Sequence, residues 1–236
     1  MTDTPLTAAE LDALRALDTP TVCNALELVA PERRGYGYTT DPLVCAFPDL
    51  PPMVGYARTA TIRSMRPSGQ SDIESRDRRI GYYEYVSKGG APKISIIQDI
   101  DGTRAGYGAF WGEVNSNIHK ALGCLGVITD GCVRDLTAIP EGFQMLAGSI
   151  KPSHAYVHIV DFGCQVNVGG MAVSHDDLVH ADRHGAVVIP HAVARKVVDA
   201  ARQIGEKEGR ILEVCRSPDF SFEKLKAAMI GPQDVH

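Results

Sequence analysis

The sequence Gly-Cys-Leu-Gly-Val-Ile-Thr-Asp-Gly-Cys-Val-Arg-Asp at residues 123–135 predicts a buried strand that runs into charged side chains. Residues 125–128 form a short apolar run, which is typical of a strand buried in a sheet. Asp130 and Gly131 indicate a tight polar turn after that run, because glycine accepts a positive φ at no steric cost. We therefore expect an α/β fold in which this strand ends at a ligand-binding edge.

Arg134 and Asp135 lie side by side just past the apolar run. A guanidinium binds a carboxylate through two parallel hydrogen bonds, and a carboxylate is a suitable ligand for a hard divalent cation. The pair therefore suits an anionic acid that is bound to a metal ion. The structural alternative is that the two side chains form a salt bridge with each other or with a helix end.

A second part of the candidate site lies upstream, where residues 111–115 read as a strand-to-helix turn. The backbone N–H groups of Val114 and Asn115 would lack partners at the helix start, so they could bind a carboxylate. Twenty residues separate Glu113 from Arg134. A helix followed by a strand fills this interval and brings both ends to the same edge of a sheet.

The stretch Gly112–Asp135 resembles the family of 4-hydroxy-4-methyl-2-oxoglutarate aldolases and regulators of ribonuclease E activity A, the RraA-like family. That family carries an acidic residue, twenty further residues and then Arg-Asp. Weaker similarity extends over most of residues 19–208, in the segments Pro20–Leu26, Met53–Thr59 and Val168–Pro190. The resemblance implies a three-layer swivelling β/β/α domain with a mixed sheet, which assembles as a homotrimer or homohexamer.

The resemblance also implies roles for individual residues. Asp135 would bind Mg²⁺ or Mn²⁺ directly, and Glu113 would contact the metal through water. The 2-oxoacid substrate would be held by Gly112, Glu113, Arg134 and the amides of Val114 and Asn115. In the aldolases a further carboxylate comes from the C-terminal region of the adjacent subunit, for which Glu206 and Glu208 are candidates.

The chain departs from the family pattern at two places. Glu113 stands where the family more often has aspartate, and His184-Gly185 stands where it commonly has Asp-Gly. Residues 31–52 and 66–90 match the family poorly, and such insertions usually lie where substrate choice is made. The departures therefore leave the identity of the acid open.

Composition limits the classes of function. The 236 residues are 44% apolar and 22% charged, as expected of a globular protein of one or at most two domains. The resemblance implies a single domain, with a core at 19–208 and a C-terminal tail at 209–236. A net charge of −5 disfavours a nucleic-acid partner. The six scattered cysteines suggest free thiols in a reducing compartment. No signal peptide or membrane span is evident, so we expect a cytoplasmic protein.

Local patterns predict the remaining elements. Thr7 and Glu10 form a capping box before a short helix, and Pro20 starts a second one that ends at Pro31. Residues 66–80 read as a solvated loop or exposed helix, with an oligomer contact as the functional alternative. We expect strands at 54–64, 94–97, 144–147, 153–160, 176–182 and 185–190, a hairpin at 166–173, a long helix at 191–214 and a last helix or packing tail at 222–229.

Other reactive side chains favour structural roles. Cys132 has no evident activating partner, so a buried thiol is the preferred interpretation. The histidines follow no zinc-binding spacing. Four lysines offer no convincing nucleophile and are expected at the surface: Lys88, Lys93, Lys120 and Lys151.

The sequence thus favours a divalent-metal-dependent lyase, a class II pyruvate aldolase or 2-oxoacid decarboxylase. It would cleave substrates of the 4-hydroxy-4-methyl-2-oxoglutarate type or decarboxylate oxaloacetate, and would release pyruvate. One alternative is a non-catalytic binding protein of the ribonuclease E inhibitor type. Another is a related lyase that acts on a different acid.

Overall fold

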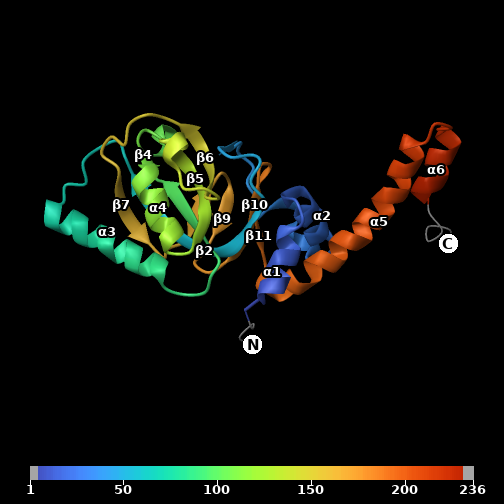
Figure 1. The fold of residues 1–236 in the computed structure, drawn as a ribbon, viewed down its shortest axis with the longest axis horizontal. Coiled ribbons are helices and arrows are strands. Elements are labelled where there is room, and N and C mark those ends of the chain that lie inside the picture. Colours follow the sequence, from blue (N-terminus) through green and yellow to red (C-terminus); the bar gives the residue numbers. More distant parts are fainter. Residues whose placement is uncertain (1–4, 231–236) are drawn as a thin grey trace.

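The computed structural model describes residues 5–230 and shows a mixed α/β architecture around a mostly closed sheet (Figure 1). The strands lie in the order β1-β6-β5-β3-β2-β10-β11, while β4 pairs with β5 and β7 pairs with β2. Their bounds are β1 Val44–Cys45, β2 Met53–Arg63, β3 Lys93–Asp99, β4 Ala109–Trp111, β5 Cys124–Val133, β6 Gln144–Ile150, β7 His158–Phe162, β10 Leu178–Asp182 and β11 Gly185–Ile189. The fold class predicted from the resemblance is confirmed.

Parallel strands form the middle of the sheet, and antiparallel strands flank them. β2, β3, β5 and β6 are parallel neighbours, whereas β10 runs antiparallel to both β2 and β11. The crossovers contain α3 (Asp72–Ser87), between β2 and β3, and α4 (Glu113–Ala121), between β4 and β5. Because parallel strands need such crossovers, the carboxyl ends of β4 and β5 meet at one edge.

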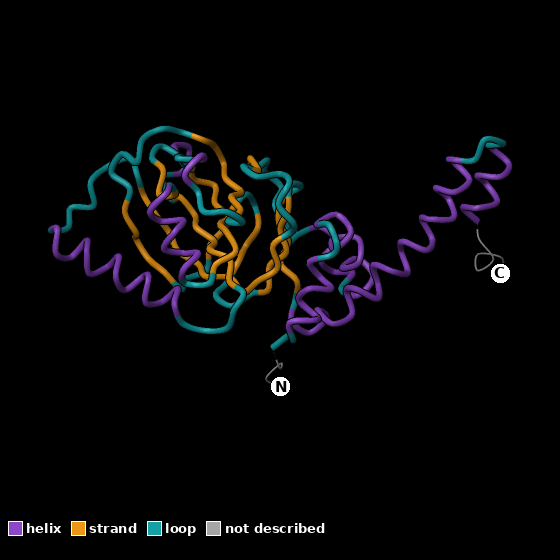
Figure 2. The backbone as a smooth tube through the Cα atoms, in the orientation of Figure 1, coloured by secondary structure: helices purple, strands orange, loops and turns teal. Residues whose placement is uncertain are grey.

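Helices cover the sheet in two groups, which Figure 2 separates by colour from the strands. Tyr82 and Val86 of α3 pack with Ile97 and Val127 of the sheet. On the other side, α1 (Ala8–Arg15), α2 (Thr19–Val29) and the start of α5 (Val197–Arg216) pack on β2, β10 and β11. A third apolar cluster joins the sheet to the predicted hairpin, which is β8 (Val166–Val168) and β9 (Met171–Val173).

Two helix starts follow the predicted signals, and a third has a capping box that was not predicted. Thr7 and Glu10 form the expected capping box of α1, and Pro20 lies in the first turn of α2. A second capping box, Ser71 with Glu74, starts α3. These caps satisfy N–H groups that the helix itself leaves without partners.

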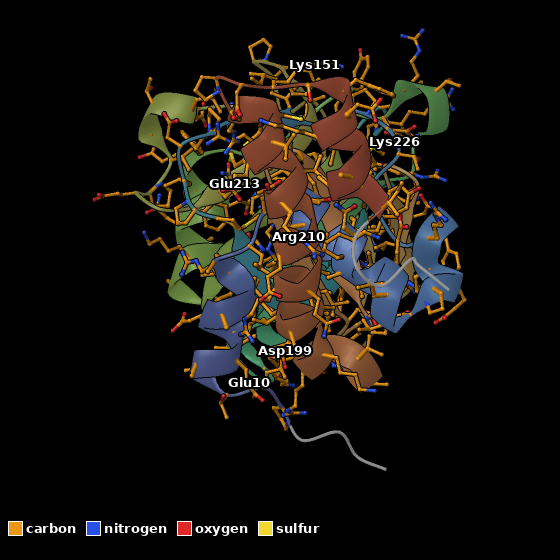
Figure 3. The ribbon with its side chains drawn as sticks, turned by 90° about the vertical axis from the view of Figure 1, so that its right-hand side faces the viewer. Glu10, Lys151, Asp199, Arg210, Glu213 and Lys226 are labelled. Atoms are coloured by element: carbon orange, nitrogen blue, oxygen red, sulfur yellow. The ribbon has the colours of Figure 1, made fainter. Side chains whose placement is uncertain are left out.

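The C-terminal helices form an arm. α5 extends away from the sheet, and α6 (Phe222–Ile230) packs against its outer part (Figure 1). Seen from that side, α5 carries Asp199, Arg210 and Glu213 (Figure 3). Exposed apolar side chains also lie on this arm, namely Leu212, Phe220, Phe222, Met229 and Ile230.

The turn predicted at Asp130 and Gly131 is wrong, because both residues lie inside β5. The ladder between β5 and β6 shifts register between Thr129 and Cys132, as at a β-bulge. The Thr129 hydroxyl accepts a hydrogen bond from the N–H of Gly131, and Asp130 Oδ1 accepts one from the N–H of Asp99 at 2.7 Å. The same residue types that favour a turn therefore form an irregularity within the strand.

Asp130 makes the stability of this bulge dependent on pH. Burial, together with the nearby charges of Asp99 and Asp41, raises the pKa of Asp130 to about 6. A raised folded-state pKa favours the folded protein below the unfolded value near 3.8, and this contribution is lost as the pH rises through about 6. Ionised Asp130 therefore lowers the free energy of unfolding at neutral pH.

We expect Asp130→Asn to stabilise the protein at pH 8 by about 1–3 kcal/mol, because the amide oxygen can still accept the Asp99 hydrogen bond without a buried charge. The gain should be smaller at pH 5, where Asp130 is mostly protonated. Thermal unfolding at both pH values measures it, with Asp49→Asn as an exposed control. An equal gain at both pH values would contradict the assignment.

For residues 66–80, the exposed helix is the alternative that holds from residue 72 onward, where α3 begins after the Ser71 capping box. Two other expectations need correction. The strand expected at 153–160 begins at His158, and Ala155 before it has a φ of 45°. The first turns of the long helix, His191–Lys196, are a 3₁₀ helix.

Lys93 is buried, which corrects the expected surface position. It is 3% exposed, and its Nζ donates to the carbonyls of Ser87 at the end of α3 and Leu122 at the end of α4. The fully buried Arg58 likewise donates to the carbonyl of Lys88 and pairs with Asp176. Two buried cations therefore satisfy carbonyls that helix ends leave without partners.

Candidate functional site

The candidate site begins where β4 passes into α4. Trp111 is fully buried at the end of β4, and Gly112 is the N-cap residue of α4 without a side-chain cap. The first bond into the helix runs from the N–H of Ser116 to the carbonyl of Gly112. Among the described residues, none accepts a hydrogen bond from the N–H of Val114 or Asn115. Two amide donors are thus open at this helix start, as the sequence predicts.

The other half of the site is the end of β5. The backbone N–H of Arg134 donates a hydrogen bond to the carbonyl of Trp111, the last residue of β4, at 2.9 Å. Asp135 follows with φ 57° and ψ 36°, the left-handed conformation that aspartate adopts more readily than most residues. Its Oδ2 accepts a hydrogen bond from the N–H of Glu113 at 3.3 Å and lies 3.5 Å from Nε of Arg134.

Gly112 allows the two halves to approach each other. A Cβ at this position would lie 2.5 Å from Asp135 Oδ2 and 3.2 Å from both Cγ and Nε of Arg134. At 2.5 Å the Asp135 carboxylate would have to move away, and at 3.2 Å the Arg134 side chain would have to shift slightly. Glycine at residue 112 is therefore required for the observed contact between the start of α4 and the Arg134–Asp135 pair.

These residues line a pocket of about 670 Å³. Arg134 and Asp135 are 34% and 37% exposed, so solvent and small molecules can reach both side chains. The predicted residues Gly112, Glu113, Val114 and Asn115 line the same pocket. The other lining residues come from β4, α4, α3, the segment before α3, and the loop before β7 together with the first residue of that strand. They include Ser75, Arg79, Tyr83, His154, Tyr156 and His158.

Hydrogen bonds hold the start of α4 in place. The Tyr83 hydroxyl donates to Asn115 Oδ1, and Asn115 Nδ2 donates to the carbonyl of Phe110. One turn further on, buried His119 contacts the carbonyl of Asn115 through Nδ1 and the Tyr82 hydroxyl through Nε2, at 2.7 and 2.8 Å. Burial lowers the pKa of His119 to about 4, so this imidazole is neutral at physiological pH. It orients the helix without adding charge to the pocket.

Several other candidates lie elsewhere. Glu206 and Glu208 are exposed on α5 and do not line the pocket of their own chain. Burial raises the pKa of Cys132 to about 11, so its thiol stays protonated and is a poor nucleophile, as expected. His184, which stands where the family commonly has aspartate, does not line this pocket, and its Nδ1 lies 3.1 Å from Asp182 Oδ1. The six cysteines are all free.

A family model described as RraA-like, Aldolase/RraA, matches residues 19–188. The chain belongs to this family. The resemblance stated from the sequence is thereby confirmed.

Two curated relatives match part of the chain. It is 31% identical over 128 residues to an uncharacterised protein of Methanocaldococcus jannaschii, and 26% identical over 135 residues to protein DlpA of Legionella pneumophila. These matches span 53% and 54% of the chain but 62% and 21% of the two relatives. The chain thus matches less than two thirds of either relative's length.

Solved structures support the RraA-like fold. An uncharacterised protein from Pseudomonas syringae pv. tomato has a TM-score of 0.72 at 21% identity, and covers 96% of both chains. RraAS2 of Streptomyces coelicolor, described as an unusual member of the RNase ES inhibitor RraA protein family, has a TM-score of 0.67 at 21% identity. That match covers 87% of this chain and 96% of RraAS2. At these identities the likeness concerns the fold.

Sequence reasoning missed the pocket wall that α3 contributes. Ser75, Arg79 and Tyr83 follow one another at intervals of four residues, so they share one face of the helix. That spacing is visible in the sequence, but only the fold shows that this face borders the pocket. His154 and His158 line the pocket too, although neither belongs to a recognisable metal-binding pattern.

The donor set of the pocket fits a divalent cation of the Mg²⁺ type. Within residues 5–230 no group of three His, Cys, Asp or Glu side chains is arranged to hold a metal. Mg²⁺ needs fewer protein ligands, because it keeps several waters and typically takes one or two carboxylates. Asp135 lines the pocket, and its Oδ1 makes no hydrogen bond to any described residue, so this oxygen has no protein partner. Glu113 lines the same pocket and is exposed.

The helices of the described residues were compared with the length and hydropathy that a membrane span requires. No helix between residues 5 and 230 is both long and apolar enough to cross a bilayer.

Proposed function

We propose that the protein is a divalent-metal-dependent lyase that acts on a 2-oxoacid and releases pyruvate, by aldol cleavage, by β-decarboxylation or by both. The observation that carries this proposal is the approach of the Arg134–Asp135 pair to the open amides of Val114 and Asn115 across Gly112. This arrangement offers an anion-binding cradle next to a carboxylate with a free oxygen. A pure binding surface does not require both.

In this proposal, hydrogen-bond donors and cationic groups bind the substrate carboxylate, and carboxylates bind the metal ion. The substrate carboxylate binds to the Val114 and Asn115 amides and to the Arg134 guanidinium, which are all donors. Asp135 holds the cation, and Glu113 accepts hydrogen bonds from water beside it. When bound, a divalent cation supplies Lewis-acid stabilisation for the negative charge that develops on the 2-oxo group. Cleavage of a 4-hydroxy-2-oxoacid and decarboxylation of oxaloacetate both leave the same pyruvate enolate.

The direct test is the release of pyruvate from oxaloacetate and from 4-hydroxy-4-methyl-2-oxoglutarate. Each acid is incubated with the protein in Mg²⁺, in Mn²⁺ and in EDTA, against a metal-only blank. Release that requires both protein and metal supports the lyase and ranks the two acids. Release no greater than the blank with either acid contradicts it as stated, and favours a related lyase on another acid or the non-catalytic, ribonuclease E inhibitor type of role.

We expect Arg134→Ala to lower kcat/KM by about 10²–10³-fold, because it removes a charged donor to the substrate carboxylate. Steady-state kinetics on the better acid measures this loss, and Arg34→Ala, which changes an exposed arginine far from the pocket, serves as control. An unchanged kcat/KM would remove Arg134 from the site.

The arm supports an oligomer as part of this proposal. The exposed apolar side chains of the arm suit contact with a second copy of the chain, in a homotrimer or homohexamer. They are Leu212, Phe220, Phe222, Met229 and Ile230. Glu206 and Glu208 lie on the same helix, so such packing could bring one of them to a neighbouring pocket. A small-molecule acid is the substrate in this proposal, and cytoplasm is the expected location.

A further inference from the structure

The face of α3 that borders the pocket is fixed relative to the candidate catalytic residues. Ser75, Arg79 and Tyr83 all line the pocket, and the Tyr83 hydroxyl is bonded to Asn115 at the start of α4. Tyr82, next to Tyr83, is fully buried and bonded to Ser95 of β3. Because Tyr82 and Tyr83, in the turn that follows Arg79, hold α3 against β3 and α4, Arg79 extends from a packed helix rather than from a loop.

Arg79 differs from its arginine neighbours on the same helix. Arg76 pairs with Asp77, and Arg78 donates to the carbonyl of Val160. Arg79 forms no hydrogen bond or ion pair with any residue in the described range 5–230. Its guanidinium therefore has all of its donors available to a molecule in the pocket.

The charge of the pocket favours a dianion. The pocket-lining arginines, Arg79 and Arg134, balance the carboxylates of Glu113 and Asp135. A bound divalent cation would leave two positive charges in excess. A 2-oxoacid with one carboxylate neutralises one of them, and a second anionic group would neutralise the other.

The size of the pocket also favours a substrate longer than the 2-oxoacid end alone. At about 30 Å³ per water in the liquid, a pocket of 670 Å³ is larger than a three-carbon 2-oxoacid needs. In the proposed function, Arg134 and the open amides of α4 bind the 2-oxoacid end of the substrate. Phe110, Ile118 and Tyr156 add apolar surface to the lining, and Arg79 adds a separate cation from α3.

We propose that Arg79 is a specificity-determining residue that binds a second carboxylate at the far end of the substrate, so that the site selects dianionic 2-oxoacids over monoanionic ones. This inference rests on the proposed function, because it assumes that the 2-oxoacid end binds at Arg134. In aldol cleavage the distal carboxylate keeps its charge, so its contact with Arg79 contributes equally to substrate and transition state. Loss of Arg79 therefore raises KM more than it lowers kcat.

A matched pair of unreactive acids tests the proposal. 2-Oxoglutarate and 2-oxopentanoate have the same five-carbon chain and differ only in the terminal group, a carboxylate or a methyl. Titration calorimetry with the full chain in Mg²⁺ gives both dissociation constants. We expect the wild type to bind 2-oxoglutarate about tenfold tighter or more, as one charge-assisted contact allows.

The variants separate the specificity of Arg79 from binding itself. Arg79→Gln should bring the two acids to within about threefold of each other and leave the affinity for 2-oxopentanoate unchanged. Arg76→Gln, on the same helix, should keep the wild-type preference, and Arg79→Lys should keep part of it. Thermal unfolding of each variant confirms that it is folded.

Two outcomes overturn the inference and leave the lyase intact: equal binding of both acids by the wild type, or a preference that survives Arg79→Gln. If the wild type binds neither acid and releases no pyruvate in the assay above, the proposed function fails and this inference fails with it.

Discussion

Asp135→Asn is expected to reduce metal-dependent release of pyruvate by about 10³-fold or more, because it removes the one carboxylate assigned to the cation. The asparagine amide has nearly the same shape and can still accept the hydrogen bond from the N–H of Glu113. Asparagine also tolerates the left-handed backbone, whose φ is 57° at this residue. The change therefore deletes a charge while it preserves local structure.

Activity and stability should separate in this variant. We expect the free energy of unfolding to change by less than about 1 kcal/mol, since Asp135 is 37% exposed and pairs only loosely with Arg134 at 3.5 Å. Kinetics with each metal and thermal unfolding measure the two effects, with Asp49→Asn as control. Full activity of the variant in saturating Mg²⁺ would show that Asp135 is not a metal ligand, whereas an unfolded variant would call for Asp135→Gly, which the backbone also accepts.

Gly112→Ala is expected to have the second largest effect, with kcat/KM reduced by about 10²-fold or more. The added Cβ would lie 2.5 Å from Asp135 Oδ2, so the carboxylate must move away from the start of α4. The backbone itself is extended at this residue, with φ −159°, and any amino acid can adopt it. The clash therefore displaces the end of a side chain and leaves the fold in place.

The prediction for Gly112 distinguishes geometry from composition, because every charged group of the site is still present in the variant. Gly35→Ala is the matched control, since a Cβ there meets no atom within 4 Å. We expect circular dichroism and thermal unfolding of Gly112→Ala to resemble the wild type. Activity equal to that of the Gly35→Ala control would mean that the approach of Asp135 to α4 is not needed for the reaction.

Arg79 lines the same pocket as Asp135 and Gly112 but comes from α3. In the proposed lyase, Asp135→Asn and Gly112→Ala are expected to affect every substrate, because both residues are assigned to the 2-oxoacid end that all candidate acids share. Arg79→Gln is expected to affect only acids with a second anionic group. A comparison of the three variants on the same pair of acids therefore separates the reacting end of the pocket from the end that selects the substrate.

Part of the site could be predicted because its signals are local in sequence. The interval between Glu113 and Arg134 holds one helix and one strand, and this connectivity returns both residues to the same edge of the sheet. The open amides of Val114 and Asn115 follow from helix geometry alone. The capping boxes of α1 and α3 are equally local, since each lies within four consecutive residues.

Other features could not be predicted because distant segments decide them. The polar pair Asp130-Gly131 has the composition of a turn. The pairing of the flanking residues Thr129 and Cys132 with β6, together with the hydrogen bond from Asp99, keeps it within β5 as a bulge. In the sequence, nothing distinguishes Lys93 from a surface lysine. In the fold it is buried, because carbonyls at the ends of α3 and α4 accept hydrogen bonds from its ammonium group. In both cases tertiary contacts outweigh the local preference.

By itself, the sequence determined the family and the α/β class, and it named the residues that we propose for the reacting end of the pocket. Short spacings and residue types carry that information, since helix starts, strand ends and adjacent side chains obey local geometry. Only the tertiary structure decided which surface lies opposite Arg134 and Asp135. That surface is the face of α3 with Arg79, and its position depends on the packing of Tyr82 and Tyr83 against β3 and α4, which are remote in sequence.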